Sequence, residues 1–321
     1  MRYMVWVPLL LSVVVAGGAP AFARALPHRM RPAGLTGVAV VSAAGWLWSW
    51  ALLAASLAER LPSAAHRLHT SAAARSADLP PAAVGACALV AVAGALLAAL
   101  VASIRLAREL ARAERLVRGL PAGRVHVIAQ ALPDAFAVGG VSGGRVVITT
   151  GMLACLDDDE RRAVLAHERA HLAGRHHWLR MVVACCAAVD PLLRHLPELV
   201  ETACERWADE RAARASGQRT VLARALGKAA LASLRSADAG SAGPDSACSG
   251  SPASGAMMPT TGPFACGFGR GGVPERMSAL LAGPPHAPRA PGGILLVSAG
   301  VTALVIGAGI HASTDLLALL R

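Results

Sequence analysis

Long uncharged apolar runs alternate with arginine-rich segments in this chain. Residues 34–58 contain no charged side chain over 25 positions, residues 79–104 none over 26, and residues 292–314 none over 23. A further apolar run covers residues 3–23. Because about 20 apolar residues in a helix cross the hydrocarbon core of a bilayer, the pattern predicts about four transmembrane helices.

The first apolar run has two interpretations. It ends in Ala21-Phe22-Ala23, which fits a signal-peptidase site, so a cleaved signal peptide is the alternative to a membrane helix. The next run follows closely, which favours the helix. If successive spans cross the membrane in alternating directions, four arginines lie on one side of the membrane and eight on the other. The eight are Arg24, Arg29, Arg31, Arg105, Arg108, Arg112, Arg115 and Arg118. The positive-inside rule then predicts a multi-pass cell-membrane protein with the region after residue 104 in the cytoplasm.

After residue 104 the pattern changes to shorter segments. Residues 105–119 predict a basic helix that leaves the membrane. The segment Arg124–Ile128 alternates and contains β-branched residues, which predicts a strand, and Ala135–Val138 and Arg145–Thr149 are two further short strand candidates. The glycine-rich stretch Gly139–Gly144 predicts a hairpin between the last two of these strands.

Helical patterns follow the predicted strands. They cover residues 156–174, Leu196–Gly217 and about 219–235. The apolar segment Trp178–Val189 has only 12 residues and is too short to span a bilayer. If it crossed, the helices before and after it would lie on opposite sides of the membrane, so we expect it to be buried or to lie in the interface.

The composition of residues 236–291, rich in Ser, Ala, Gly and Pro, predicts a flexible linker with a short helix near residues 273–281. The predicted organisation is therefore three membrane helices in residues 1–104, a compact domain in residues 105–235, this linker, and a last membrane helix at residues 292–314.

The overall composition supports a membrane protein. Hydrophobic residues make up 55% of the 321 residues, charged residues 16%, and the mean hydropathy is +0.49. The net charge of +11 comes almost entirely from arginine, and Tyr3 is the only tyrosine, so stacking on nucleic-acid bases has little support. Seven cysteines show no CxxC spacing, which argues against a zinc knuckle or a disulfide framework.

The strongest chemical signal is His167-Glu168-x-x-His171. Residues four apart share one face of a helix, so both imidazoles can reach one metal ion. Glu168 lies beside them as the general base that would take a proton from water at the metal, the pattern of zinc peptidases. The acidic run Asp157–Glu160 favours a helix start just before the motif, because its charges complement the helix dipole.

A catalytic zinc usually has three protein ligands, and two candidates exist for the third. His177 completes the longer HExxHxxGxxH pattern, in which Gly174 would let the chain turn back to the metal. Glu205 is the other candidate, with Asp209 one turn later on the same face. Asp209 would accept a hydrogen bond from the second ring nitrogen of a liganding histidine and so orient it.

A resemblance favours Glu205. The segments Ala135–Gly140, Val147–Leu153, Ala163–His171 and Glu205-x-x-Ala208-Asp209 resemble the BlaR/MecR family of membrane zinc metallopeptidases, and more distantly the HtpX and CAAX-prenyl-protease group. In those families the ExxAD glutamate is the third ligand. The resemblance implies a mainly α fold in which about four membrane helices accompany a zincin-like α+β metallopeptidase domain with a small β-hairpin or sheet.

The expected activity is zinc-dependent cleavage of internal peptide bonds, carried out by the predicted peptidase domain of this membrane protein. The resemblance implies regulated proteolysis in signalling, with a small winged-helix transcriptional repressor as a plausible substrate. About seven residues follow the last apolar run, so a penicillin-sensor domain is not expected after it. The strand near Ala135–Val138 is expected as an edge that pairs with an extended substrate. Candidates for oxyanion stabilisation are His176, His177, Arg206 and Arg211.

Two other function classes remain open at this stage. One is an inactive membrane scaffold or receptor that retains the peptidase fold, which would tolerate Glu168→Gln. The other is a metal transporter, which would need ionisable residues within its spans. Residues 34–58 and 79–104 contain none.

Overall fold

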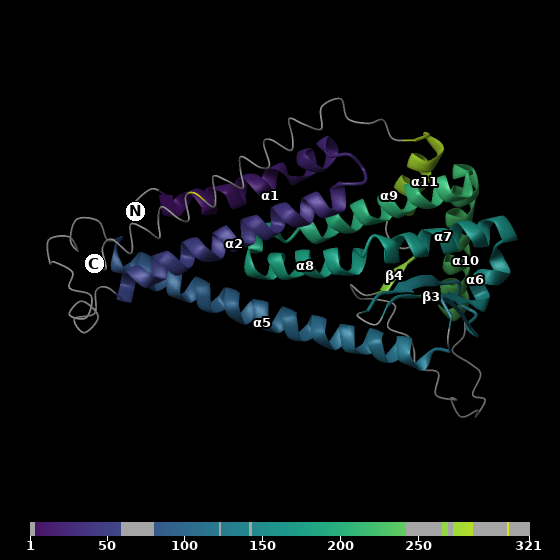
Figure 1. Ribbon diagram of the computed structural model, residues 1–321, viewed down its shortest axis with the longest axis horizontal. Helices are drawn as coiled ribbons and strands as arrows, with labels where there is room; N and C mark the ends of the chain where they lie inside the picture. Colours follow the sequence, from purple (N-terminus) through teal and green to yellow (C-terminus); the bar gives the residue numbers. More distant parts are fainter. Residues whose placement is uncertain are drawn as a thin grey trace. The chain divides into compact units, whose positions relative to one another are not determined.

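The computed structural model describes residues 4–58, 80–121, 123–140, 143–241, 265–268, 272–284 and 307, and most of them are helical, as predicted (Figure 1). The described chain divides into two compact units. The first contains the described residues up to Arg105 together with Val182–Glu201 and Gly307, and the second contains the described residues of Leu106–Met181 and Thr202–His286. This division differs from the predicted boundaries, because residues 182–201 join the first unit and parts of the predicted linker join the second.

Within the described residues, three helices are long and apolar enough to cross a membrane. They are α1 (Val7–Ala25), which follows the short η1 (Met4–Trp6), α2 (Arg31–Ala58) and α5 (Ala82–Gly119). Helices α1 and α2 lie side by side in the first unit (Figure 1). The predicted span at 292–314 lies outside the described residues, apart from Gly307.

Helix α5 does not stop where the apolar run ends. We predicted a membrane span to residue 104 and a separate basic helix after it, but the two form one helix of 38 residues. The sequence around the junction, Ala102-Ser103-Ile104-Arg105-Leu106-Ala107-Arg108, contains neither glycine nor proline, so nothing in it favours a break. The helix exposes a row of apolar side chains suited to lipid, including Leu89, Val90, Leu96, Leu97 and Leu100.

A buried carboxylate joins three segments of the first unit. Asp190 follows α8 (His176–Val189) and caps η2 (Pro191–Leu193), where its Oδ1 accepts a hydrogen bond of 3.1 Å from the amide of Leu192. Its Oδ2 accepts a hydrogen bond from the hydroxyl of Ser12 in α1, and Ser42 in α2 donates to Ser12 at 3.0 Å. These bonds offset the cost of burying the carboxylate and tie the turn after α8 to α1 and α2.

The second unit contains a four-stranded sheet in the order β1-β3-β2-β4. Its strands are β1 (Val125–Ile128), β2 (Ala135–Val138), β3 (Arg145–Thr149) and β4 (Ala265–Gly267). The predicted hairpin of β2 and β3 is confirmed, with Ala135 opposite Ile148 and Val138 opposite Arg145. Strand β1 runs parallel to β3.

Strand β4 corrects two expectations. It lies inside the predicted flexible linker, whose composition gave no sign of a short segment that can pair with another strand. It runs antiparallel to β2, with Phe136 opposite Gly267 and Val138 opposite Ala265. Strand β2 is therefore an internal strand, and the prediction that Ala135–Val138 forms a free edge for substrate is wrong for this structure.

Both faces of the sheet are covered. Alternate side chains of β2 and β3, including Phe136, Val138 and Val147, pack against the end of α5 around Ala113 and Val117. The opposite face contributes residues such as Ala135 and Ile148 to the main core of the unit, which also contains residues of α6 (Thr150–Cys155), α7 (Asp158–Ala173), α9 (Leu196–Ser216), α10 (Arg219–Ser241) and α11 (Val273–Leu281).

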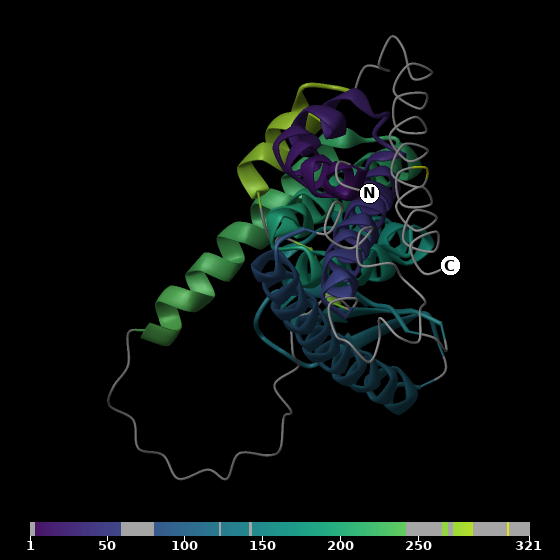
Figure 2. The same ribbon diagram turned by 90° about the vertical axis from the view of Figure 1, so that its left-hand side faces the viewer.

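The predicted helices match these elements to within a few residues, and α11 has the predicted bounds. Helix α10 is the exception, because it continues six residues beyond the predicted end at 235. Figure 2 shows α10, in green, extending away from the other helices of its unit, and Leu231 and Leu234 on it are exposed.

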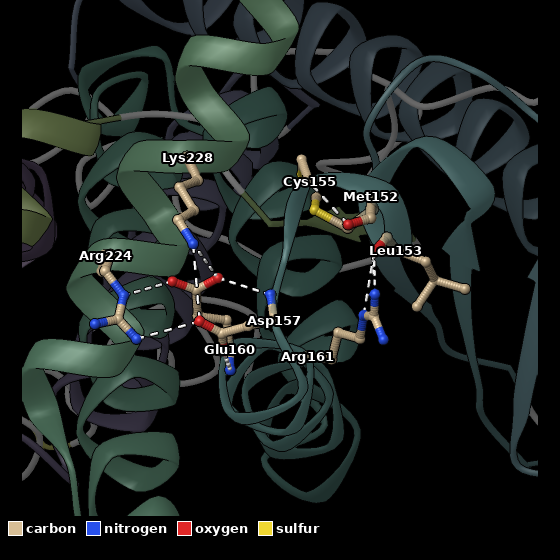
Figure 3. Close-up of polar contacts among 8 residues, drawn as sticks. All are labelled: Met152, Leu153, Cys155, Asp157, Glu160, Arg161, Arg224 and Lys228. Atoms are coloured by element: carbon tan, nitrogen blue, oxygen red, sulfur yellow. Dashed lines mark hydrogen bonds and ion pairs between the residues drawn. The ribbon is translucent and has the colours of Figure 1, made fainter.

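The start of α7 is fixed by a capping box and by a charge cluster, drawn in Figure 3. The Asp157 side chain accepts from the amide of Glu160, and the Glu160 side chain accepts from the amide of Asp157, both at 2.9 Å. The fully buried Glu160 carboxylate also accepts from Arg224 at 2.6 Å and from Lys228, the only lysine, at 2.7 Å. Since Arg224 and Lys228 belong to α10, this cluster fastens α7 to α10.

The Glu160 cluster should contribute to stability in a pH-dependent way. Burial raises the pKa of Glu160, but the bonds from Lys228, the Asp157 amide and Arg224 together hold it below its ordinary value. A lowered folded-state pKa stabilises the protein above the unfolded-state pKa of about 4.3 and less at lower pH. We expect Glu160→Gln to lower stability at neutral pH by roughly 1–3 kcal/mol, with the difference from wild type shrinking below about pH 4.3.

Thermal unfolding in detergent across this pH range measures the effect. Asp158→Asn is the matched control, because the exposed Asp158 pairs with Arg161 on the surface of the same helix turn and such pairs contribute little. Equal melting temperatures for Glu160→Gln and Asp158→Asn at neutral pH would contradict the prediction.

Candidate metal centre

The two motif histidines face each other inside the second unit. His167 and His171 lie one turn apart on α7, whose apolar side chains Ala163, Val164 and Ala170 are buried in the same unit. Their exposed fractions are 0% and 2%, and their Nε2 atoms are 3.0 Å apart. The helix therefore presents both Nε2 lone pairs to one point, as the spacing predicted.

Glu205 on α9 reaches the same point. Its Oε2 lies 3.5 Å from His167 Nε2 and its Oε1 lies 3.4 Å from His171 Nε2. Together these residues form a group whose ligand atoms all lie within 4.8 Å of one another. Ligands about 2.0–2.1 Å from a tetrahedral zinc would be separated by about 3.3 Å, so this group of two imidazoles and a carboxylate fits zinc in both spacing and chemistry.

Asp209 lies behind His167, on the side away from Glu205. It follows Glu205 by one turn of α9, and its Oδ1 is 3.0 Å from His167 Nδ1. Burial lowers the pKa of His167, but Asp209 and Glu205 outweigh it and raise this pKa to about 9. Asp209 lies where a carboxylate can orient the His167 ring, and its role in holding Nε2 toward a metal stays a prediction.

Arg276 is part of the centre and was missed by sequence reasoning. From α11 it donates to both carboxylate oxygens of Asp209, at 2.6 and 2.8 Å, and its Nη1 lies 3.0 Å from Glu205 Oε2. Only 3% of it is exposed. One sequence signal pointed to it, because Arg276 lies one turn before the buried Leu280 and so on the buried face of a short amphipathic helix.

Glu168, the residue beside His167 in the motif, is buried in the same unit. It is fully buried, and neither carboxylate oxygen has a hydrogen-bond partner among the residues that the structure describes. Burial raises the pKa of Glu168 well above its ordinary value, an effect that the neighbouring His167 partly opposes. An unpartnered buried carboxylate beside a metal-ligand cluster is suited to hold water and to accept its proton.

His177, the alternative third ligand, does not join the cluster. Its ring lies against Gly139 at the end of β2, where any Cβ would collide with it. The glycine of the longer motif also has another role. Gly174 has an ordinary right-handed φ of −79°, and its missing side chain leaves room for the ring of His176.

Two of the candidates for oxyanion stabilisation, Arg206 and Arg211, contact groups outside the cluster. Arg206 donates to the carbonyl of Glu275 at 3.1 Å, and the Arg211 guanidinium lies over the ring of Trp207 at 5.2 Å. His176, in contrast, contacts the site, because its Nδ1 is 2.9 Å from His171 Nδ1. Among the contacts described for the four candidates, only that of His176 reaches a residue of the cluster.

Comparison with known proteins finds similarity to peptidases. Residues 103–195 match the family model of Peptidase family M48. Proteases described as HtpX homologs share 36% identity over 80 residues in Thermoanaerobacter pseudethanolicus, 36% over 92 in Acidiphilium cryptum and 41% over 76 in Methanothermobacter thermautotrophicus. These alignments cover 23–28% of this chain and 27–32% of those relatives, so the chain spans about a third or less of each relative's length. No solved structure matches the chain.

The M48 match covers only some of the residues in the candidate site. It includes His167, Glu168 and His171 but ends before Glu205, Asp209 and Arg276. The similarity therefore lies with M48 peptidases and proteases described as HtpX homologs, and the more specific BlaR/MecR assignment stays a prediction. The place of Glu205 in the cluster comes from the fold, and its role as a ligand also stays a prediction.

Arg276 should be needed for stability of the metal-free centre. Arg276→Leu leaves the Asp209 and Glu205 carboxylates buried without their cation, and breaking a buried pair in this way costs roughly 3–5 kcal/mol. We expect a large fall in the melting temperature of the metal-free protein in detergent. Added zinc should raise the melting temperature of this variant more than that of wild type, because the ion would supply positive charge beside Glu205.

Arg206→Leu is the control, since it removes a neighbouring arginine that bonds a backbone carbonyl. A metal-free Arg276→Leu protein that melts with wild type would contradict the expected role.

Proposed function

We propose that this chain is a membrane-embedded, zinc-dependent endopeptidase whose site faces the cytoplasm. The observation that carries the proposal is the buried cluster of His167, His171 and Glu205 next to the buried carboxylate of Glu168, which has no hydrogen-bond partner in the described part of the chain. The M48 match over residues 103–195 and the three apolar helices support a membrane protease. The cytoplasmic orientation rests on the arginine distribution.

His167 Nε2, His171 Nε2 and one oxygen of Glu205 would hold the zinc ion. When bound, zinc supplies a Lewis acid that polarises a peptide carbonyl and lowers the pKa of water in the site. Glu168 takes a proton from the attacking water and then delivers it to the leaving amine. Asp209 keeps His167 oriented, and Arg276 neutralises the carboxylates of Asp209 and Glu205 so that they remain ionised when buried.

The raised pKa of Glu168 fits the second half of this cycle. A carboxylate in dry surroundings holds a proton more readily than one in water. The acid form can therefore persist until the amine leaves. Nearby cationic groups oppose this effect, so the balance between burial and charge sets the pH at which Glu168 serves as a base.

The test combines metal analysis with proteolysis by the full chain in detergent. We expect Glu168→Gln to retain one zinc ion and to lose cleavage of casein or of a fluorogenic peptide mixture by roughly 10²–10⁴-fold. We expect Glu205→Gln to lose zinc, because an amide is a poor replacement for a carboxylate ligand. His177→Ala should retain zinc.

Each result discriminates between the alternatives. Zinc loss in His177→Ala but not in Glu205→Gln would reverse the assignment of the third ligand. Unchanged cleavage by Glu168→Gln would remove Glu168 as the base, and a wild-type protein that binds zinc but cleaves nothing would favour the scaffold or receptor class.

A further inference from the structure

The two imidazoles of the cluster are held from behind by different groups. His167 Nδ1 faces the Asp209 carboxylate at 3.0 Å. His171 Nδ1 faces another histidine, with His176 Nδ1 at 2.9 Å. A ligand imidazole that donates its second N–H to a neighbour has a fixed tautomer and ring orientation. His176 therefore faces Nδ1 of His171 just as Asp209 faces Nδ1 of His167, but His176 is an imidazole and Asp209 is a carboxylate.

The hydrogen bond between the two rings constrains where both protons lie. To present a lone pair at Nε2, His171 must carry its proton on Nδ1. This N–H then donates to His176 Nδ1, which must be unprotonated, so the proton of His176 lies on its Nε2. A neutral His176 in this tautomer is compatible with only one tautomer of neutral His171, the one that can bind a metal through Nε2.

The local fold fixes His176 in this position. Helix α7 ends at Ala173, and Arg175 adopts a left-handed φ of 50°, so the chain reverses and α8 begins at His176 itself. A Cβ at position 174 would collide with His176 Nε2, so Gly174 allows the close approach. The ring packs edge-on against Trp207 of α9, with centroids 4.8 Å apart, and only 1% of His176 is exposed.

We propose that His176 is a positioning residue that accepts the Nδ1–H of His171 and so holds His171 Nε2 toward the metal ion. The inference rests on the proposed function, since it assigns a role to a neighbour of a proposed ligand. It replaces the sequence expectation of an oxyanion role for His176, because its contact is with the back of the His171 ring and not with the side that faces the cluster.

The test compares two substitutions that separate packing from hydrogen bonding. His176→Phe keeps a flat ring against Trp207 but removes the acceptor. His176→Asn loses part of the packing but keeps an oxygen near the position of Nδ1. His177→Phe is the matched control, because the neighbouring His177 is also buried but lies against Gly139.

The readout is the affinity of the full detergent-solubilised chain for Zn²⁺ and Co²⁺, measured by chelator competition. The absorption bands of bound Co²⁺ report ligand geometry. We expect His176→Phe to weaken metal binding by roughly 10–100-fold and to alter the Co²⁺ spectrum. His176→Asn should recover most of the affinity, and His177→Phe should match wild type. A purely packing role predicts the reverse order, with His176→Asn the weaker binder.

The outcomes separate the two proposals. If wild type binds zinc and His176→Phe binds it equally well, the positioning role is overturned while the proposed function stands. If wild type binds no zinc, the proposed function fails and this inference fails with it.

A measurement on wild type keeps the inference testable if His176→Phe does not fold. In the zinc-loaded chain labelled with ¹⁵N-histidine, we expect the Nδ1 proton of His171 to be protected from exchange and hydrogen-bonded to a second ring nitrogen. Rapid exchange of this proton with water would overturn the inference.

Discussion

The contact between Arg276 and two buried carboxylates is the interaction on which the centre depends. Glu205 and Asp209 lie one turn apart on α9 and are 7% and 2% exposed, so their negative charges would repel each other and would be costly to bury alone. Arg276 donates hydrogen bonds to Asp209 and forms an ion pair with Glu205, and Asp209 in turn lies against His167. Burial raises the pKa of Asp209, but Arg276 and His167 outweigh it and lower this pKa to about 2. The candidate ligands are thus held together in the metal-free structure.

This constraint explains why residues far apart in the sequence belong to one site. The motif helix α7 supplies the histidines, α9 supplies the carboxylates, and α11 supplies the balancing charge. Helix α7 is fixed at its start by the Glu160 cluster with α10, and α11 packs on α10 as well. Arg219 of α10 strengthens that contact, because it donates to the carbonyls of Leu280 and Ala279 and to the carboxylate of Glu210. Helix α10 therefore aligns the elements that carry the candidate ligands and the balancing charge of Arg276.

The sequence predicted the elements better than their associations. The helical spacing of His167 and His171, the capping run before them and the β2–β3 hairpin depend on local periodicity and turn residues, and the structure has all of them. Arg276 pairs with Asp209, 67 residues away in the sequence, and β4 pairs with β2, about 130 residues away, and no local pattern states such pairings. His176 lies only five residues from His171, but their contact depends on the left-handed turn at Arg175. Gly174 shows the difference well, since its motif spacing suggested a turn toward His177 whereas the fold uses it to admit the ring of His176. The winged-helix repressor stays a prediction, because it rests on resemblance alone.

Strand β4 bears on how a substrate of the proposed peptidase would approach. It pairs with the side of β2 that was expected to receive an extended peptide, and Phe268, directly after it, packs edge-on against His167 with ring centroids 5.1 Å apart. The Arg276 guanidinium lies 5.8 Å from the same phenyl ring. A peptide that pairs with β2 must therefore displace β4, which has three residues opposite β2. Net backbone hydrogen bonds of about 1 kcal/mol each make so short a strand inexpensive to exchange for an equivalent one. Since an incoming strand would restore the same bonds, the larger barrier is the removal of Phe268 from its contact with His167.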